Sequence, residues 1–364
     1  MTEYKYSQMR CRTLILVPAC YVITCFMIRY GIIGCGAWGR HYAAVIEKNP
    51  RLELVAIAEV AEAAQTELRR NYPGVSVSAD YRDVIASNVD VVAVVSPNSL
   101  HHEHGMAVLN ADKHLLIEKP FGLSTAECDD MIRLAKEKKL QLVVGHQFRL
   151  SSLWGLIKKM VDDGFIGEPK YALVELSRNP YRLGADGWRY DLKRVGDWIA
   201  EEPIHFLDLA AWYFEKYTQP VSVHASANST DSSRPELQDN VGATIDFANG
   251  SFAVVTQTLS AFEHHQTVKI AGTQGALWGG WSGALDREPH PSFFLKAFDG
   301  KEVRGIPIEK ITGELFELED QIDLMANIIT GSATAHCSGE DGKRAVALSA
   351  ATLESAKRGQ PIVL

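Results

Sequence analysis

A glycine-rich turn close to the start of the chain constrains the fold more than any other feature. The sequence GCGAWG at residues 34–39 follows a short β-branched run and opens a helix-like segment. In that setting the first glycine permits a tight turn, the second lets the backbone approach a pyrophosphate, and the third allows close packing of helix on strand. A lone match also fits an ordinary strand-to-helix turn, but this context favours a dinucleotide site. Its candidate cofactor contacts are Gly34, Gly36, Ala37, Trp38 and Gly39.

Strand and helix signals alternate from residue 28 to residue 145. Apolar runs of strand length are bounded by turn signals and separated by amphipathic segments of helix length. This pattern is typical of a parallel sheet that helices cover on both faces. We expect a Rossmann-type, doubly wound α/β domain over residues 27–145. Its strands are expected at 30–33, 52–58, 89–95, 114–118 and 140–145, and its helices at 37–48, 61–71, 101–110 and 125–138.

The pattern changes beyond residue 146. Asn249-Gly250 is typical of a tight hairpin turn between two strands. We expect residues 146–330 to form an α+β substrate and oligomerisation domain with a mostly antiparallel, open-faced sheet, and residues 331–364 to close the fold with a helix and a strand. The main elements are expected to be helices at 153–163 and 198–213 and strands at 170–176, 221–227, 239–246, 251–259 and 267–271.

The first 26 residues fit neither domain. Lys5, Arg10 and Arg12 precede an apolar run at 14–28, as in a secretory signal, but the run is short for a membrane span. From Met27 the sequence reads as the natural beginning of the first strand. We interpret residues 1–26 as an over-extended start or a signal-like segment, with an extension of unknown purpose as the third alternative.

Charge and cysteine content exclude several classes of function. Lys and Arg total 37 against 45 Asp and Glu, and this net charge of -8 would repel a nucleic-acid backbone. The cysteines show no CxxC pair and no zinc-ligand spacing, which favours free thiols in a reducing compartment. We expect a cytoplasmic protein with no nucleic-acid, membrane or metal partner. The six cysteines are Cys11, Cys20, Cys25, Cys35, Cys128 and Cys337.

Glu59 stands at the end of the second expected strand, about 20 residues after the last glycine of the turn. An acidic side chain at this place accepts hydrogen bonds from ribose hydroxyls, and its charge repels a 2′-phosphate. We therefore expect the cofactor to be NAD, with NADP less favoured. The alternative is a solvated acid that starts the following helix.

Two tripeptides end the fourth and fifth expected strands, Ser96-Pro97-Asn98 and Glu118-Lys119-Pro120. Ligands of open α/β sheets bind at this carboxyl edge, so an amine from Lys119 is placed to donate to a substrate hydroxyl oxygen. Out of context such a lysine is more often a surface charge. The histidines that follow the first tripeptide lack the carboxylate or cysteine partners of a zinc site. Cofactor contacts are expected from Ser96, Pro97, Asn98, His101, Glu118 and Lys119.

Glu201 and His205 lie four residues apart in the helix expected at 198–213, which places both on one face. A carboxylate beside an imidazole sets its tautomer and tunes its pKa, as a general base for a hydroxyl proton requires. Taken alone, a buried histidine in a helix is more often structural. Asp208, one turn further, is expected either to pair with His205 or to anchor the helix.

The segment 179–191 combines aromatic rings with guanidinium groups. Sugars need both, because their C–H faces stack on rings while their hydroxyls take directed hydrogen bonds. Aromatic residues in a subunit interface would look the same. The candidate substrate contacts are Lys119, Arg149, Tyr181, Trp188, Arg189, Glu201 and His205.

In this order, the motifs resemble those of the Gfo/Idh/MocA oxidoreductase family over residues 27–364. The resemblance rests on Ser96-Pro97-Asn98, on the stretch 110–120 that ends in the Glu-Lys-Pro tripeptide, on Gly187-Trp188-Arg189 and on the acid-x-x-x-His stretch at 201–205. The combination carries the specificity, since each motif alone is short.

The resemblance implies that Lys119 contacts substrate and cofactor, that the peptide bond before Pro120 is cis and that His205 is catalytic. The chain departs from the family in one respect. The acid four residues before this histidine is usually aspartate after glycines, whereas here it is Glu201 after residues 197–200. The substrate preference of aspartate-bearing relatives therefore does not transfer.

Together the residues and the resemblance predict an NAD-dependent dehydrogenase that oxidises a secondary hydroxyl of a sugar, sugar derivative or inositol-like cyclitol to a ketone by hydride transfer. Lys119, His205 and Glu201 are its expected catalytic residues. Two alternatives stay open: redox-neutral glycoside cleavage through transient oxidation, and a non-enzymatic sensor of sugar or NAD. Retention of Lys119 and His205 together argues against the sensor. We expect a homodimer or homotetramer, because antiparallel sheets with an exposed face often pair.

Overall fold

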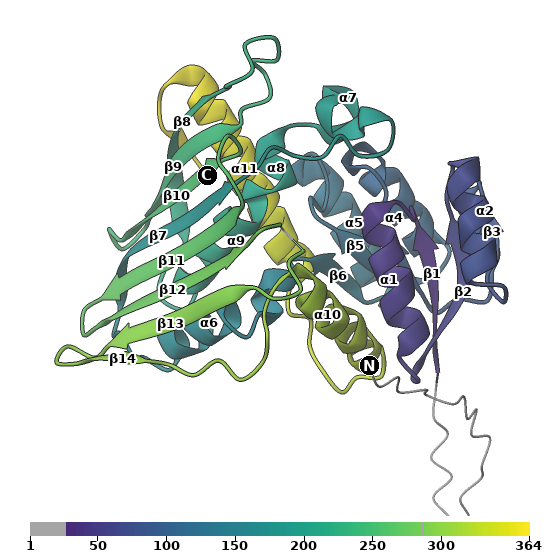
Figure 1. Cartoon of the computed structure of the whole chain (residues 1–364), viewed down its shortest axis with the longest axis horizontal. Coiled ribbons are helices and arrows are strands. Elements are labelled where there is room, and N and C mark those ends of the chain that lie inside the picture. Colours follow the sequence, from purple (N-terminus) through teal and green to yellow (C-terminus); the bar gives the residue numbers. More distant parts are fainter. Residues whose placement is uncertain (1–26, 286) are drawn as a thin grey trace, which may run out of the picture.

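Six parallel strands form the first sheet of the computed structural model, which describes residues 27–285 and 287–364 (Figure 1). The strand order is β3-β2-β1-β4-β5-β6, so the order reverses between β1 and β4 and a crevice opens there at the carboxyl edge. The expected doubly wound domain is confirmed. Its strands are β1 (Ile28–Ile33), β2 (Leu52–Ala58), β3 (Ser76–Ser78), β4 (Val91–Val94), β5 (His114–Glu118) and β6 (Leu142–Gly145).

Helices cover both faces of this sheet. Two elements, β3 and α3, were not expected from the sequence. Both are short: β3 has three residues, and α3 has six residues and begins after a cap in which Asp80 accepts a hydrogen bond from the Arg82 backbone. Neither gives a periodic signal long enough to detect. The helices are α1 (Ala37–Lys48), α2 (Glu62–Asn71), α3 (Tyr81–Ala86), α4 (His101–Asn110) and α5 (Thr125–Lys138).

Nine strands form the second sheet, in the order β14-β13-β12-β11-β7-β10-β9-β8-β15. Among the described residues of this second sheet, only β7 and β10 pair in parallel, so the expected mostly antiparallel sheet is confirmed. The strands are β7 (Pro169–Arg178), β8 (Pro220–Asn228), β9 (Asn240–Phe247), β10 (Phe252–Thr258), β11 (His264–Gly272), β12 (Ala276–Gly283), β13 (Ser292–Phe298), β14 (Val303–Gly305) and β15 (Ile362–Val363).

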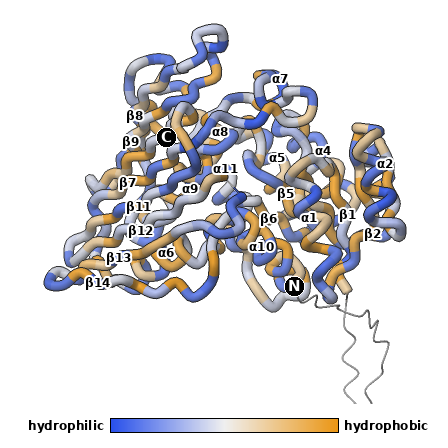
Figure 2. The backbone as a smooth tube through the Cα atoms, viewed as in Figure 1, coloured by the Kyte–Doolittle hydropathy of each residue, from blue (hydrophilic) through white to orange (hydrophobic). Residues whose placement is uncertain are grey.

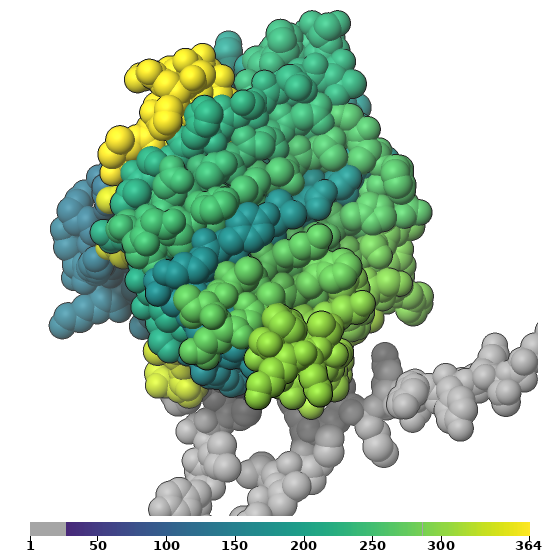
Figure 3. Space-filling view, turned by 90° about the vertical axis from the view of Figure 1, so that its left-hand side faces the viewer, coloured from purple at the N-terminus to yellow at the C-terminus, as the bar shows by residue number. Residues whose placement is uncertain are grey.

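One face of the second sheet packs on helices and the other is uncovered. Buried and less buried residues alternate along β7, and Val174 and Leu176 join Phe206 in the core. Figure 2 shows that the strands of this sheet contain both hydrophobic and hydrophilic residues. The helices on the packed face are α6 (Trp154–Asp162), α9 (Pro203–Phe214) and α11 (Gly339–Arg358). Figure 3 looks onto the opposite, uncovered face, where the exposed rings of Trp278 and Phe294 lie 5.1 Å apart.

The last two long helices return to the first domain. The helix α10 (Glu314–Ile329) lies within the segment expected to form the substrate domain, yet its Leu318 and Ile322 are buried in the core of the first sheet. The Tyr30 hydroxyl donates to the Ile322 carbonyl at 2.9 Å. The following helix, α11, lies between the two sheets (Figure 1). Its Val346 belongs to the core of the first domain and its Leu348 to the core of the second.

The helix expected at 198–213 is broken in two. The short α8 (Trp198–Glu201) ends before Glu202, whose φ and ψ are -131° and -50°, and α9 begins at Pro203. Proline has no N–H to donate and disfavours helical geometry in the residue before it. Glu201 and His205 therefore do not share one continuous helix face, and the sequence-based expectation is wrong on this point.

In the portion of the chain that the structure describes, no helix is long and apolar enough to cross a membrane. Cys35, Cys128 and Cys337 are buried free thiols, as expected. The expectations for residues 1–26, with their three cysteines, lie outside the described residues.

Candidate active site

The three glycines of the turn meet three different steric demands. Gly34 has a φ of +90°, and a Cβ there would lie 2.7 Å from the Val95 carbonyl oxygen. A Cβ on Gly39 would lie 2.2 Å from the Gly34 carbonyl oxygen, so only glycine lets α1 pack this closely on β1. A Cβ on Gly36 would meet nothing within 4 Å. In this motif, a dinucleotide pyrophosphate approaches the backbone at this open position.

The start of α1 fits an anionic group. Gly36 caps the helix without a side-chain hydrogen bond, and the first turn contains no acidic residue. Such an N-terminus presents backbone N–H groups and a positive dipole end to a phosphate. Glu59 lies beside the turn, where its carboxylate accepts 3.0 Å hydrogen bonds from the backbone N–H groups of Cys35 and Ala61. The residues present therefore suit a dinucleotide.

A pocket of about 360 Å³ lies between the two domains, next to the glycine turn. It brings together residues from distant parts of the sequence, and most of the predicted site residues line it. The amine of Lys119, from the end of β5, and the imidazole of His205, from α9, share this one cavity. The predicted residues on its wall are Ala37, Trp38, Ser96, Asn98, His101, Glu118, Lys119, Tyr181, Trp188, Arg189, Glu201 and His205.

Lys119 joins the two domains at the floor of the pocket. Its Nζ donates to the backbone carbonyl of Glu201, and the peptide bond between Lys119 and Pro120 is cis, as the resemblance implied. The lysine follows Glu118, the last residue of β5, at the carboxyl edge of the sheet. Its side chain is thus held at the place where parallel sheets bind their ligands.

The carboxylate of Glu201 is engaged away from His205. It accepts hydrogen bonds from Asn98 Nδ2 at 3.0 Å and from Arg189 Nε at 2.8 Å. Burial raises the pKa of Glu201, but the charges of Lys119 and Arg189 outweigh it and hold this pKa below its ordinary value. Glu201 is therefore an anion that fixes the loop carrying Arg189 against the first domain. It does not orient the imidazole in this structure.

His205 is buried and neutral at the pocket wall. Its ring packs 4.8 Å from that of Phe148, and its exposed fraction is 4%. Its Nδ1 is sealed from solvent without a hydrogen-bond partner in the described residues, whereas its Nε2 is not sealed. Burial lowers the pKa of His205 well below its ordinary value, and the nearby Lys119 and His146 add to this effect. A neutral imidazole with an accessible nitrogen is the form that a proton acceptor requires.

Glu118, Trp38 and His101 use their polar atoms inside the protein. The Glu118 carboxylate accepts hydrogen bonds from Trp38 Nε1 at 2.8 Å and from the Tyr42 hydroxyl at 2.6 Å, and burial raises its pKa. The ring nitrogens of His101 lie 2.6 Å from the Pro120 carbonyl and 2.8 Å from that of Ser96. These contacts tie the ends of β4 and β5 together and shape the pocket.

Arg149 and Asp208 are placed differently from the expectation. Arg149 does not line the pocket; its guanidinium makes a buried, two-pronged ion pair with Asp208, at 2.8 and 2.7 Å. Asp208 is therefore the partner of this arginine and not of His205. A guanidinium next to a buried carboxylate satisfies both charges, which explains why Arg149 is not available to a substrate.

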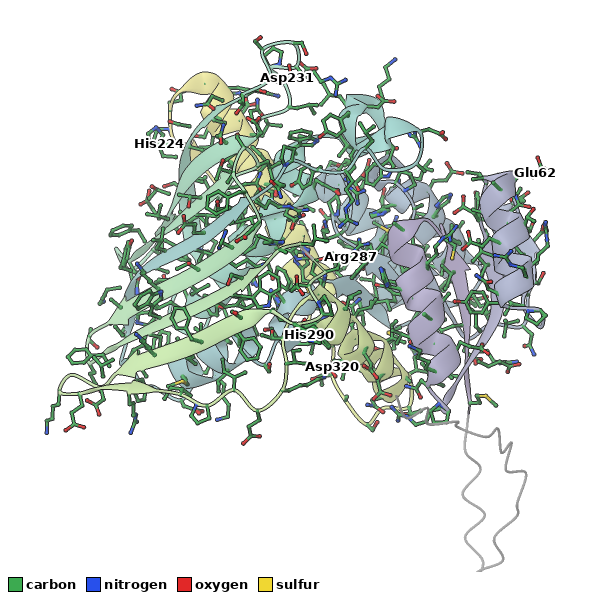
Figure 4. All side chains as sticks on the ribbon, in the orientation of Figure 1. Glu62, His224, Asp231, Arg287, His290 and Asp320 are labelled. Atoms are coloured by element: carbon green, nitrogen blue, oxygen red, sulfur yellow. The ribbon has the colours of Figure 1, made fainter. Side chains whose placement is uncertain are left out.

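Several pocket residues were not predicted, because no local motif marks them. Arg178, at the end of β7, pairs with Glu202 at 3.1 Å. Arg287, from the loop after β12, places its guanidinium 4.8 Å from the Trp38 ring and lies between the two domains in Figure 4. Gln147, Arg182 and Glu314 also line the pocket. No group of three potential metal ligands occurs among the residues that the structure describes.

Two family models match successive parts of the chain. One, an oxidoreductase family with an NAD-binding Rossmann fold, matches residues 28–146, and the other, the GFO/IDH/MocA C-terminal domain, matches residues 154–278. The chain belongs to the Gfo/Idh/MocA oxidoreductase family. The family resemblance seen in its motifs is confirmed.

Relatives of this Gfo/Idh/MocA protein match it over most of its length. The inositol 2-dehydrogenase of Rhizobium meliloti is 25% identical over 332 residues, which cover 90% of this chain and 96% of that protein. The myo-inositol 2-dehydrogenase of Thermotoga maritima is 26% identical over 343 residues, which cover 93% and 98%. The crystal structure of the aldose-aldose oxidoreductase of Caulobacter crescentus with glycerol matches this structure with a TM-score of 0.79 at 21% sequence identity. The match covers 93% of this chain and 99% of that chain. That likeness shows the shared fold.

Proposed function

We propose that the protein is an NAD-dependent dehydrogenase that oxidises a secondary hydroxyl of a sugar or cyclitol to a ketone. One observation carries the proposal: Lys119 and His205 line the same pocket, beside a glycine turn that suits a dinucleotide. The names of the relatives, which include inositol dehydrogenases, support the substrate class. A pocket with aromatic rings and several charged donors also suits a polyol.

The proposed roles follow from the chemistry of each side chain. The Lys119 ammonium donates to the hydroxyl oxygen of the substrate and stabilises negative charge there, and Nε2 of His205 accepts the hydroxyl proton. The bound nicotinamide supplies the acceptor for the hydride that leaves the same carbon. Glu201 holds Arg189 in place, and the ring of Trp188 lies beside that guanidinium, 4.6 Å away. Tyr181, Trp188 and Arg189 thereby form a wall that suits sugar hydroxyls and C–H faces.

We propose NAD as the cofactor in preference to NADP. Glu59 places a carboxylate at the end of β2, directly against the glycine turn. A 2′-phosphate there would meet this negative charge, whereas ribose hydroxyls would donate to it. We expect Glu59→Ala to narrow the ratio of NAD to NADP turnover at least tenfold, and an unchanged ratio would contradict the assignment.

The proposal is tested by following NADH absorbance while inositols, aldoses and glycosides are offered with NAD. We expect NADH to accumulate with at least one free polyol, and Lys119→Met or His205→Gln to lower turnover by at least about a hundredfold. Lys113→Met, just before the opposite end of β5, and His224→Gln, at an exposed position of β8, are matched controls. Glycoside cleavage without NADH would favour the redox-neutral alternative. Intact turnover in either pocket variant would overturn the assigned roles.

We also propose a homodimer or homotetramer assembled through the uncovered face of the nine-stranded sheet. The exposed Trp278 and Phe294 on this face support the proposal. Sedimentation of the wild type and of Trp278→Glu tests the assembly, since a charge at such an interface should shift the protein toward the monomer.

We propose the reducing cytoplasm as the compartment of the protein. The three buried cysteines, which are free thiols, support this proposal.

A further inference from the structure

A second histidine lies behind the proposed base. His146 directly follows β6, and the last residue of β6, Gly145, is the register partner of Glu118 on β5. The residues that follow these partners, Lys119 and His146, therefore leave neighbouring strands at the same carboxyl edge. The His146 side chain is buried, with 1% of the residue exposed. No local sequence motif pointed to it.

His146 faces both His205 and Asp208. Its ring is edge-on to that of His205, with centroids 5.3 Å apart and planes at 80°. Its Nδ1 lies 3.6 Å from Asp208 Oδ2. Neither nitrogen of His146 has a hydrogen-bond partner in the described residues, and Nδ1 of His205 likewise has none. Leaving a buried polar atom without a hydrogen-bond partner is unfavourable, so three such atoms in two adjacent rings require a physical reason.

The carboxylate beside His146 is rigidly held. Arg149 donates to both oxygens of Asp208 and also to the backbone carbonyl of His336 at 3.2 Å. Burial raises the pKa of Asp208, but the charge of Arg149 outweighs it and keeps this pKa below its ordinary value. Asp208 is therefore an anion that only accepts hydrogen bonds, and it is held at a fixed position beside Nδ1 of His146.

An accepting carboxylate selects one arrangement of protons. It favours the tautomer of His146 in which Nδ1 carries the proton, which leaves a lone pair on Nε2. That lone pair matches a proton on the unpartnered Nδ1 of His205. His205 then presents the lone pair of its own Nε2, the nitrogen that is not sealed from the pocket. Hydrogen bonds of this kind are commonly long before substrate binds and tighten in the complex.

We propose that His146 is a positioning residue that holds His205 in the tautomer and orientation of a proton acceptor, with the Asp208–Arg149 pair fixing His146 in turn. The inference rests on the proposed function, because it assigns a task to the proposed base. Glu201, expected from the sequence to orient His205, is occupied by Asn98 and Arg189 instead. Besides His146, the side chain that acts on the pKa of His205 is Lys119. An ammonium group only donates hydrogen bonds, so Lys119 offers no acceptor to Nδ1 of His205.

The first test needs no substrate. Long-range ¹H–¹⁵N NMR on the full chain with labelled histidine reports which ring nitrogen carries the proton, and His205→Gln assigns the signals. We expect His205 and His146 of the wild type each to be protonated on Nδ1. We expect His146→Phe, which keeps a buried ring but removes both nitrogens, to leave His205 as a mixture of tautomers. His336→Phe, which removes two unpartnered nitrogens elsewhere in the same buried region, should leave His205 unchanged.

Protonation of His205 on Nε2 in the wild type would overturn the proposal even if His146→Phe failed to fold. An unchanged His205 tautomer in a folded His146→Phe variant would also overturn it. Because this measurement is independent of turnover, it separates the proposal from the proposed function. The absence of any oxidised polyol would count against the dehydrogenase alone.

The second test uses turnover. We expect His146→Phe to lower kcat by about 10- to 100-fold, the range found when a partner that orients a metal-bound imidazole is lost. The KM for the polyol and the affinity for NAD should change less than about threefold, since His146 lies behind the pocket wall. His146→Gln, whose amide oxygen can replace the acceptor, should recover part of kcat. Equal losses in the Phe and Gln variants would indicate a packing role and would contradict the assignment.

Discussion

The indole of Trp38 donates a 2.8 Å hydrogen bond to the carboxylate of Glu118. This contact ties the helix that follows the glycine turn to the strand that ends just before Lys119. The Tyr42 hydroxyl donates to the same carboxylate at 2.6 Å, and Gln321 of α10 donates to Tyr42 in turn at 2.8 Å. A single buried carboxyl group thus connects the proposed cofactor turn, the proposed amine and the helix that returns from the second domain.

Replacement of Glu118 should therefore cost stability. We expect Glu118→Ala to lower the free energy of unfolding by about 2–4 kcal/mol, because it leaves the Trp38 and Tyr42 donors buried without an acceptor. Urea denaturation measures the change. Glu103→Ala, at an exposed hydrogen bond to Tyr81, is the control and should cost less than about 1 kcal/mol. A loss of unfolding free energy as small as that of the control would show that the hydrogen bonds of Glu118 do not stabilise the end of β5.

The glycines of the turn should separate binding from stability. We expect Gly36→Ala to fold with an unchanged melting temperature and to lose at least tenfold in NAD affinity, because its Cβ meets no protein atom but enters the space proposed for the pyrophosphate. Gly39→Ala should lower the melting temperature, because its Cβ would lie 2.2 Å from a backbone oxygen. Calorimetry with and without NAD measures both. An unchanged NAD affinity in Gly36→Ala would contradict the proposal that the cofactor binds at this turn.

The activity should persist at mildly acidic pH. Burial, Lys119 and His146 lower the pKa of His205 well below its ordinary value of 6.5. The base therefore stays neutral as the pH falls through 6.5 and is lost only when His205 takes a proton at lower pH. We expect kcat/KM for polyol oxidation to stay constant as the pH is lowered through 6.5. An acidic limb at or above that pH would indicate a solvated histidine.

Glu317 should make the stability of the fold depend on pH. Burial raises its pKa from 4.5 to about 7, although Thr312 and the Gly313 backbone donate to it. The unfolded chain loses this proton near pH 4.5 and the folded chain near pH 7, so the folded state binds more protons between these values. Stability contributed by this group is present below pH 4.5, falls as the pH rises to about 7 and is level above it.

We expect Glu317→Gln to abolish this slope. The difference in the free energy of unfolding between the variant and the wild type should be larger at pH 8 than at pH 4.5, by up to about 3 kcal/mol. Urea denaturation across the pH range measures the difference between the two proteins. Glu319→Gln, at an exposed position of the same helix, is the control. Parallel stability curves for the wild type and Glu317→Gln would contradict the shifted pKa.

Local signals predicted the first domain well. The expected bounds of α1, β2, β5 and α5 coincide with those in the structure, because apolar periodicity and terminal residues specify such elements without help from distant contacts. The break before Pro203 was also present in the sequence, since proline disfavours a helix at the preceding residue. It was missed because the apolar pattern continues on both sides of it.

The partners of the site residues were harder to predict, because they depend on which strands and helices meet. Arg149 looked like a substrate contact, but α9 brings Asp208 to it. Glu201 looked like the partner of His205, but the first domain supplies Asn98 to its carboxylate. Arg287 reaches the pocket from a loop far along the chain. Spacing along a sequence carries no information on such long-range pairings.

The helix α11 places Val346 in one hydrophobic core and Leu348 in the other, only two residues apart. The two domains therefore cannot come apart at this helix without exposing apolar surface on both sides. Melting of either half removes part of the packing of the other, so thermal unfolding of the described chain should be a single cooperative event. One continuous helix thereby links the two walls of the pocket, and we expect a substrate to enter mainly through movement of side chains and loops.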